Sequence, residues 1–315
     1  MSGHKELRIG IQGQKYFSGI KLKSNTVALV VLITAIFIWG GNWPVMKEGL
    51  NHITPLWFSM VRFALGAATL FIVQIVAKNL YLPKKKDLPL ILSIGLVQML
   101  IFTALGSIAM TVVPAGRSAV LAYTTPLWVI PFSVLLFKEH ISRRQVVGTL
   151  LGIIGVVVLF NPFVFNWNDS QAIFANGLLL LASFCWSMCI LHLRYTKNKV
   201  NAFQLAPWQM LVATVVLIPI SYIFEGPFTG DDSTEFWHIC LYLGPLATAF
   251  CFCAVNSASR ALSGATMSCA MLGVPVLGLI FSTITLGESL SFNLVIGTLF
   301  IVGGICAVIS TKSAK

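Results

Sequence analysis

Ten apolar runs, each of roughly 20 residues, recur along this chain. A helix of about 20 apolar residues spans the roughly 30 Å hydrocarbon core of a bilayer, so each run can cross a membrane. Only 10% of the residues are charged, against roughly 25% in soluble domains, which leaves too few polar side chains to cover a water-exposed surface. The runs are continuous rather than alternating, which disfavours a β-barrel. They cover residues 27–46, 56–78, 88–111, 115–136, 144–161, 172–193, 203–223, 236–259, 263–286 and 291–310.

The basic residues sort to one side of the predicted membrane. If the runs are threaded alternately, 18 of the 21 Lys and Arg residues fall on the side of the N-terminus, and the opposite loops hold only Lys47. By the positive-inside rule, both termini are cytoplasmic. The chain is therefore predicted to be an all-α polytopic membrane protein with ten transmembrane helices and cytoplasmic N- and C-termini. The net charge of +11 then reflects topology, and we expect no nucleic-acid partner.

The chain repeats itself at a distance of 149 residues. Without gaps, the stretch 126–155 aligns on 275–304, and Pro, Glu, Ser, Gly and Thr residues coincide. Five spans per copy is an odd number, so the second copy enters the membrane from the opposite side. The two copies thus form an inverted pair, an arrangement common in secondary transporters. We predict a cytoplasmic tail at 1–25, a first five-helix repeat at 26–162 and a second at 171–311.

Three features of the sequence resemble the EamA type of the drug/metabolite transporter superfamily. They are WGGN at Trp39–Asn42, the module from Pro126 to Glu139, and the glycines from Gly148 to Gly155, with their second-half counterparts. The resemblance implies an inner-membrane exporter of ten helices in two EamA repeats, with a central cavity between the repeats. Similar proteins move amino acids, nucleobases, sugar derivatives, cofactors and drugs, so the likeness says little about the substrate.

Pro126 and Pro275 lie in the middle of the fourth and ninth runs. Each lacks an N–H group, so the carbonyls of Ala122 and Met271 lose their usual helical partners. In a membrane such freed groups are tolerated where protein, water or a ligand satisfies them. A pair of broken helices at matching depth indicates a midplane cavity, and a packing kink is the alternative reading.

Glu139 and Glu288 each begin a Glu-x-Ile/Leu-Ser motif between two runs. The serines of the motifs are predicted N-caps, and Gln145 would complete a capping box with Ser142. A carboxylate just ahead of a helix is favoured by the helix dipole. The two glutamates are therefore expected either to fix the turns between helices or to act as gates.

Aromatic and amide side chains within the runs are the candidate cavity lining, because polar groups inside a bilayer need a partner or a water-filled path. For the tryptophans, an interface or packing role is the alternative. Arg62 and Arg117 are charged positions within the runs, with either a structural role or a substrate carboxylate as partner. The candidate substrate-binding residues are Trp39, Asn42, Gln98, Tyr123, Trp186 and Asn256.

No Asp or Glu lies inside any of the ten runs, which argues against cation/proton antiport through a buried carboxylate. We predict a secondary transporter that exports small metabolites, such as amino acids or related neutral or zwitterionic solutes, across the bacterial inner membrane by alternating access. Transport is expected to be facilitative, without proton coupling. The alternatives are a proton-coupled drug, nucleobase or cofactor transporter of the same fold and, more distantly, an intramembrane enzyme or a channel. We expect no catalytic residues, cofactor or metal. The expected partners are a small-molecule substrate and lipid, with monomer and dimer both left open.

Overall fold

The computed structural model describes residues 25–160, 168–196, 202–262, 267 and 270–309. All regular secondary structure in these ranges is helical, and the helices fall into ten stretches that follow the ten apolar runs. In the first half the helices are α2 (Asn25–Gly49), α3 (Pro55–Val76), η1 (Lys85–Asp87), α4 (Leu88–Leu92), η2 (Ser93–Ile101), α5 (Phe102–Met110), α6 (Ala115–Ala122), α7 (Thr125–Phe137) and α8 (Arg143–Phe160). In the second half they are α9 (Ser170–Tyr195), α10 (Ala202–Glu225), α11 (Thr234–Leu241), η3 (Tyr242–Phe250), α12 (Cys251–Ala261), α14 (Gly273–Leu286) and α15 (Phe292–Ile309).

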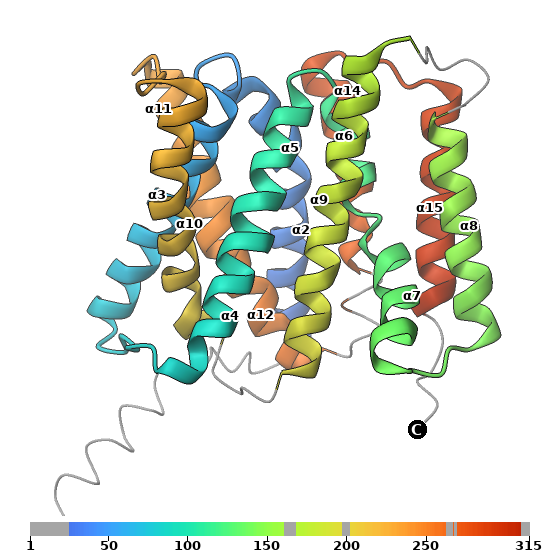
Figure 1. Ribbon diagram of the computed structural model, residues 1–315, viewed down its shortest axis with the longest axis horizontal. Helices are drawn as coiled ribbons and strands as arrows, with labels where there is room; N and C mark the ends of the chain where they lie inside the picture. The colour runs from blue at the N-terminus through green and yellow to red at the C-terminus, as the bar shows by residue number, and fades with distance from the viewer. Residues whose placement is uncertain (1–24, 161–167, 197–201, 263–266, 268–269, 310–315) are drawn as a thin grey trace, which may run out of the picture.

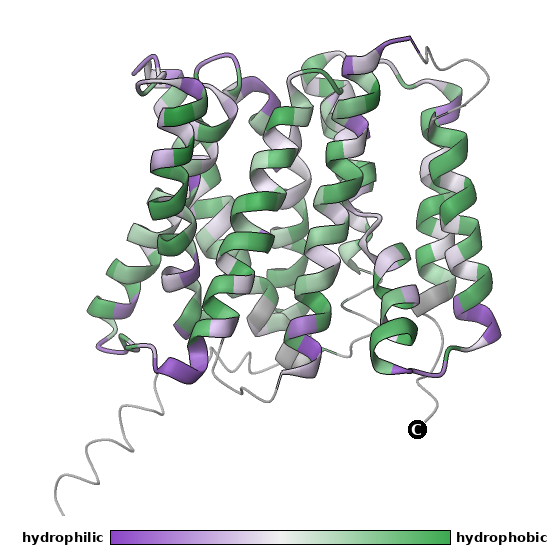
Figure 2. Cartoon of the chain, viewed as in Figure 1, coloured by the Kyte–Doolittle hydropathy of each residue, from purple (hydrophilic) through white to green (hydrophobic). Residues whose placement is uncertain are grey.

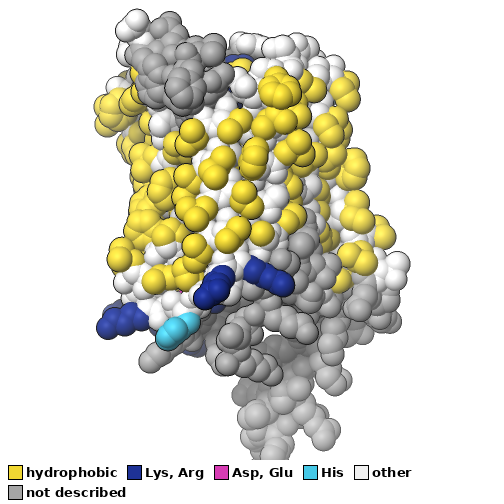
Figure 3. All heavy atoms as spheres, turned by 90° about the vertical axis from the view of Figure 1, so that its right-hand side faces the viewer, with side chains coloured by type: hydrophobic (Ala, Val, Ile, Leu, Met, Phe, Trp, Pro, Cys, Tyr) yellow, Lys and Arg dark blue, Asp and Glu magenta, His cyan; other side chains and the backbone are white. Residues whose placement is uncertain are grey.

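The sides of the helical bundle are apolar. Figure 2 shows hydrophilic residues gathered at the two ends of the helices, with hydrophobic residues between them. Among the described residues, seven helices are long and apolar enough to cross a membrane, and Gly273–Leu286 and Phe292–Ala307 are shorter apolar helices. Large apolar side chains such as Phe224 and Phe292 are exposed. Figure 3 shows hydrophobic side chains covering much of one side of the bundle. Such a surface suits lipid rather than water. The predicted all-α, multi-pass membrane fold is confirmed.

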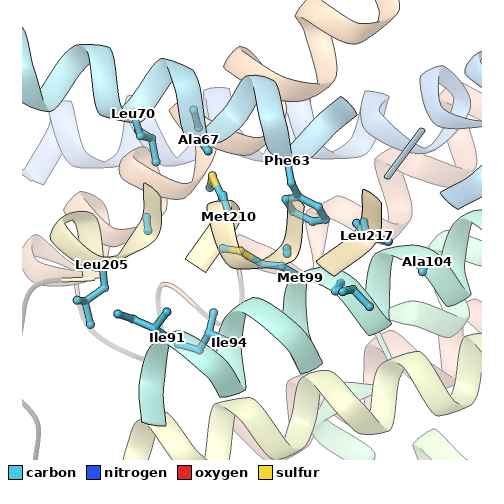
Figure 4. Packing of buried hydrophobic residues seen from close by; sticks show 14 of the residues in the cluster. Phe63, Ala67, Leu70, Ile91, Ile94, Met99, Ala104, Leu205, Met210 and Leu217 are labelled. Carbon is cyan, nitrogen blue, oxygen red and sulfur yellow. The ribbon is translucent and has the colours of Figure 1, made fainter. Parts of the chain in front are cut away.

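The largest buried cluster lies where α3, η2 and α10 converge. Figure 4 shows Phe63 of α3, Met99 of η2 and Met210 of α10 meeting there. A Cβ atom added to Gly95 would lie 2.7 Å from the carbonyl oxygen of Gln209, so η2 approaches the backbone of α10 directly. Small residues permit such close helix contacts in membranes, where packing replaces the hydrophobic effect between helices.

The internal repeat reappears as backbone geometry. Ser93–Ile101 and Tyr242–Phe250 are both π-helical, and they are 149 residues apart. The helices α7 and α14 end at Lys138 (φ 54°) and Gly287 (φ 65°), again 149 residues apart and both in the left-handed conformation of a helix C-cap. Sequence repetition thus extends to unusual backbone conformations that the apolar runs alone do not indicate.

The last helices of the two halves, α8 and α15, lie side by side (Figure 1). An added Cβ at Gly155 would lie 2.7 Å from the Gly297 oxygen, and one at Gly304 would lie 2.5 Å from the Gly148 oxygen. Gly148 and Gly155 are the repeat equivalents of Gly297 and Gly304. Exchanging the two repeats therefore turns the first contact into the second. This reciprocity is the pattern that a local two-fold axis produces.

Candidate functional site

The fourth apolar run is broken next to Pro126, where the sequence predicts a break. Helix α6 ends at Ala122, and α7 begins at Thr125, with Pro126 in its first turn. The Thr124 hydroxyl lies 2.9 Å from the Ser183 hydroxyl of α9, and the Ser187 hydroxyl donates to the Thr125 carbonyl at 3.0 Å. Side chains from the second half of the chain therefore supply partners to the interrupted backbone of the first half.

The ninth run is interrupted at the equivalent place. Leu272, the repeat equivalent of Tyr123, is the N-cap of α14, and Pro275 is buried in the first turn of that helix. An added Cβ at Gly278 would lie 2.9 Å from the Cβ of Ala119, and one at Gly40 would lie 2.6 Å from the Leu277 Cβ. The segment that follows this break is thus packed tightly between α2 and α6.

Arg62 is the centre of a polar group inside the bundle. Its Nε donates to the Thr248 hydroxyl at 2.8 Å, and its Nη1 contacts the Met46 sulfur at 3.0 Å. The Asn42 Nδ2 contacts the same sulfur at 3.1 Å. The buried Oδ1 of Asn42 has no hydrogen-bond partner among the described residues. Three elements, α2, α3 and η3, therefore meet at one cation and one unsatisfied amide oxygen.

Two aromatic side chains join α2 to η3 beside this group. The Trp39 Nε1 donates to the Ala247 carbonyl at 2.7 Å, and the Tyr242 hydroxyl donates to the Ile38 carbonyl at 2.6 Å, so α2 is joined to η3 twice. Tyr123, at the break of the fourth run, packs against the same buried cluster as Trp39, and it lies close enough to Arg62 for an electrostatic interaction. Of the predicted cavity residues, Trp39, Asn42 and Tyr123 are thus brought together around Arg62.

The predicted cavity residues Trp186 and Gln98 lie on other elements than the Arg62 group. The Trp186 ring of α9 packs edge-on against Phe102 of α5, with centroids 4.5 Å apart. Gln98 is partly buried in η2, at the repeat equivalent of Ala247. Buried Gly106 has no atom within 4 Å of an added Cβ, and it lies one turn from Phe102 on the same face. Open space therefore adjoins this aromatic pair.

The predicted site residue Asn256 belongs to α12, but its side chain lies outside the described residues.

Glu288 binds the start of a helix in the other half. Its two carboxylate oxygens accept hydrogen bonds from the backbone N–H groups of Ala115 (2.6 Å) and Gly116 (2.9 Å), at the N-terminus of α6. Sequence reasoning had associated this carboxylate with its own turn instead. A cavity of about 210 Å³, lined in part by Glu288 and Arg117, lies beside the contact. Glu139, its repeat equivalent, forms an ion pair with Arg194 at 2.9 Å.

The predicted N-caps are present. The Ser142 N–H donates to Gln145 Oε1 at 2.8 Å and the Gln145 N–H donates to the Ser142 hydroxyl at 3.3 Å, which completes the capping box. The Ser291 hydroxyl accepts from the Leu294 N–H at 3.2 Å. Gly303 differs from the glycines of the helix contact, because it is exposed and has open space beside it.

Sequence reasoning singled out Arg62 but missed Met46, Tyr242 and Thr248. An apolar run gives no face-specific signal for a methionine or a threonine, since almost every neighbour is apolar too. The repeat offered one clue, because Tyr242 and Thr248 lie in the segment equivalent to the one that contains Gln98.

At one end of the bundle, ligand atoms of Glu48, His52 and Glu235 lie within 4.8 Å of one another, close enough to hold a metal ion.

Comparison with known proteins gives concordant results. A sequence model of the EamA-like transporter family matches residues 26–161 and 173–310. An uncharacterized transporter, YoaV, of Bacillus subtilis is 27% identical over 87% of this chain and 94% of its own length. A probable amino-acid metabolite efflux pump of Salmonella typhimurium is 26% identical over 90% of this chain and 93% of its own. A crystal structure with 21% sequence identity has a TM-score of 0.62 and covers 90% of this chain and 96% of that one, which supports the fold alone.

Proposed function

Because this chain belongs to the EamA-like transporter family, we propose that it exports small metabolites across the bacterial inner membrane by alternating access. Amino acids and related neutral or zwitterionic solutes are the proposed substrates. The Salmonella relative, named a probable amino-acid metabolite efflux pump, supports this substrate class. An aromatic enclosure with few polar groups also suits such solutes, since ligand sites combine apolar walls with a small number of polar contacts that fix orientation.

The observation that carries the proposal is the convergence of both halves on Arg62. Met46 and Arg62 come from the first half, whereas Thr248 comes from the second. Tyr123 stands at the break between α6 and α7, where α9 also contributes hydrogen bonds. A solute held here touches parts of both halves, so a movement of one half against the other changes its access to each side of the membrane.

We propose facilitated export down the solute's own gradient. All ten Asp and Glu residues lie outside the apolar runs, so the runs contain no carboxylate to carry a proton. The same fold coupled to protons, with a drug, nucleobase or cofactor as substrate, is the competing function.

The test is counterflow in proteoliposomes containing the purified full-length protein. Vesicles loaded with one unlabelled amino acid at a time should take up the labelled form of that amino acid with saturable kinetics, and protein-free vesicles should not. An imposed pH gradient should not drive accumulation against concentration. Accumulation driven by the pH gradient would overturn the facilitative mechanism, and no saturable flux of any amino acid would overturn the proposed substrate class.

A further inference from the structure

The Arg62 side chain has no carboxylate partner in the described part of the chain. Its protein contacts are a hydroxyl and a thioether, and none of the ion pairs among the described residues includes it. Arg62 lies seven residues after the start of α3 at Pro55, about 10 Å along the helix axis. A charge at such depth is costly unless it is paired or hydrated. A negatively charged ligand can therefore supply the partner that Arg62 lacks among the described residues.

The guanidinium group keeps a face for that ligand. The Nε atom is used by Thr248, whereas Nη1 meets only the Met46 sulfur, which is a weak acceptor. Nη2 has no acceptor among the described residues, and the side chain is only partly buried. Arginine binds carboxylates best through two parallel N–H···O bonds. The Nη1 and Nη2 pair presents that geometry, with the thioether as the contact to be displaced.

Asn42 adds a second polar atom beside the first. Its Nδ2 and the Arg62 Nη1 contact the same sulfur atom, so the two side chains lie next to each other. If the amide were turned over, its carbonyl oxygen would face the sulfur, and two acceptors would meet. The nitrogen is therefore assigned to the position beside the sulfur. The buried Oδ1 is then an acceptor without a donor among the described residues, which is unfavourable for a buried polar atom.

We infer that Arg62 and Asn42 form a recognition site for a carboxylate that carries an ammonium group on the adjacent carbon. The carboxylate binds Arg62, and the ammonium donates to the Asn42 carbonyl oxygen. Trp39, which donates to the carbonyl next to Thr248, and Tyr123, which lies near Arg62, provide apolar surface for the rest of the solute. This site rests on the proposed function and assigns the specificity for α-amino acids to two named residues.

Binding to the purified full-length protein in detergent, measured by isothermal titration calorimetry, separates this inference from transport. The probes are leucine, threonine and phenylalanine, each compared with its amide, which lacks the carboxylate, and with its analogue lacking the amino group. Wild type should bind each amino acid about tenfold to a hundredfold more tightly than its amide, as expected for a charged hydrogen bond. It should also prefer the amino acid to the analogue without the amino group.

The variants assign each preference to a residue. In Arg62→Gln the preference for the acid over the amide should vanish, and Arg62→Lys should retain part of it. In Asn42→Ala the preference for the amino group should vanish while the carboxylate preference remains. Arg117→Gln is the matched control, since Arg117 lines the separate cavity beside Glu288, and it should keep both preferences.

The wild-type comparison stands even if Arg62→Gln does not fold. Equal binding of acid and amide by wild type, no binding of any of the three amino acids, or a preference that persists in Arg62→Gln would each overturn the inference. Inorganic phosphate is included as an anion without an ammonium group, and phosphate binding as tight as that of the amino acids would also overturn it. Selective binding without counterflow would leave the site standing and reject the transport proposal. Counterflow of amino acids without selective binding of acid over amide would leave the transport proposal standing and reject the site.

Discussion

At the scale of single residues, Glu288 has a contact that the sequence did not predict. It follows α14 in the chain, yet its carboxylate caps α6 of the other half through two backbone N–H groups. The first N–H groups of a helix have no intrahelical acceptor, and the helix dipole favours a negative charge there. One side chain thereby fixes the relative position of two segments 172 to 173 residues apart in sequence.

We predict that Glu288→Gln lowers the thermal unfolding temperature in detergent, because it removes the charge and one of two charge-assisted hydrogen bonds. The expected loss is about 1–2 kcal/mol. Glu139→Gln is the matched control. It breaks a partly exposed ion pair with Arg194, which is worth about 0–1 kcal/mol. An unfolding temperature that falls equally in the two variants would contradict the capping role.

The residues of the Arg62 group were only partly predictable from the sequence. Asn42, Tyr123 and Arg62 stand out in apolar runs, because polar groups and charges there require partners. Met46 does not stand out, since methionine is an ordinary residue of an apolar helix. That Thr248 meets Arg62 depends on how α3 packs against η3, and no local pattern specifies that contact.

At the scale of helices, the two proline breaks could be predicted, whereas the two π-helices could not. Proline removes a donor and forces a local change, so its position is an explicit signal. The π-helical geometry of η2 and η3 has no equivalent signal, because one extra residue in a turn does not alter a run that is apolar on every face. Pro245 lies within η3, but η2 contains no proline.

The ends of the helices were predicted less well than their centres. The run at 172–193 forms a helix from Ser170 to Tyr195, and the run at 27–46 lies within a helix from Asn25 to Gly49. Helices continue past the apolar core with polar side chains, so hydropathy underestimates them. A break within a run leaves hydropathy unchanged, so the run at 115–136 does not show that it contains two helices, α6 and α7.

The contact between α8 and α15 supports a prediction with an internal control. An added Cβ at Gly297 would lie 2.8 Å from the Gly155 oxygen and 2.9 Å from the Leu159 nitrogen. Gly297→Ala should therefore lower the unfolding temperature, although alanine is normally about 1 kcal/mol better than glycine in a helix. Gly303→Ala on the same helix faces open space and should leave it unchanged or raise it. Equal responses of the two variants, measured by thermal unfolding in detergent, would contradict the close contact.

At the scale of the whole molecule, the alternation of the helices makes the assignment of sides testable. The lysines at 84–86 lie just before α4, at one end of the bundle, whereas α11 begins at the other end (Figure 1). The excess of basic residues predicts that the first end is cytoplasmic. This expectation comes from the distribution of charge along the sequence.

The measurement is labelling of single cysteines in intact cells by a membrane-impermeant reagent, in a background without native cysteines. Glu235→Cys should react from outside, and Lys85→Cys should react only after the cells are opened. Both positions are exposed, so a difference reports sidedness rather than burial. Labelling of Lys85→Cys in intact cells would reverse the orientation.

The glycine contact between α8 and α15 also has a consequence for biosynthesis. The two halves of this contact are separated in the chain by more than a hundred residues, and α15 is the last described helix to leave the ribosome. Since helices in a bilayer insert first and associate afterwards, α8 has to remain in lipid with its glycine face uncovered until α15 has been made. The nascent chain therefore forms this contact, at one edge of the bundle (Figure 1), only after α15 has been made. A chain released before α15 carries an uncovered glycine face by which a membrane protease can recognise it.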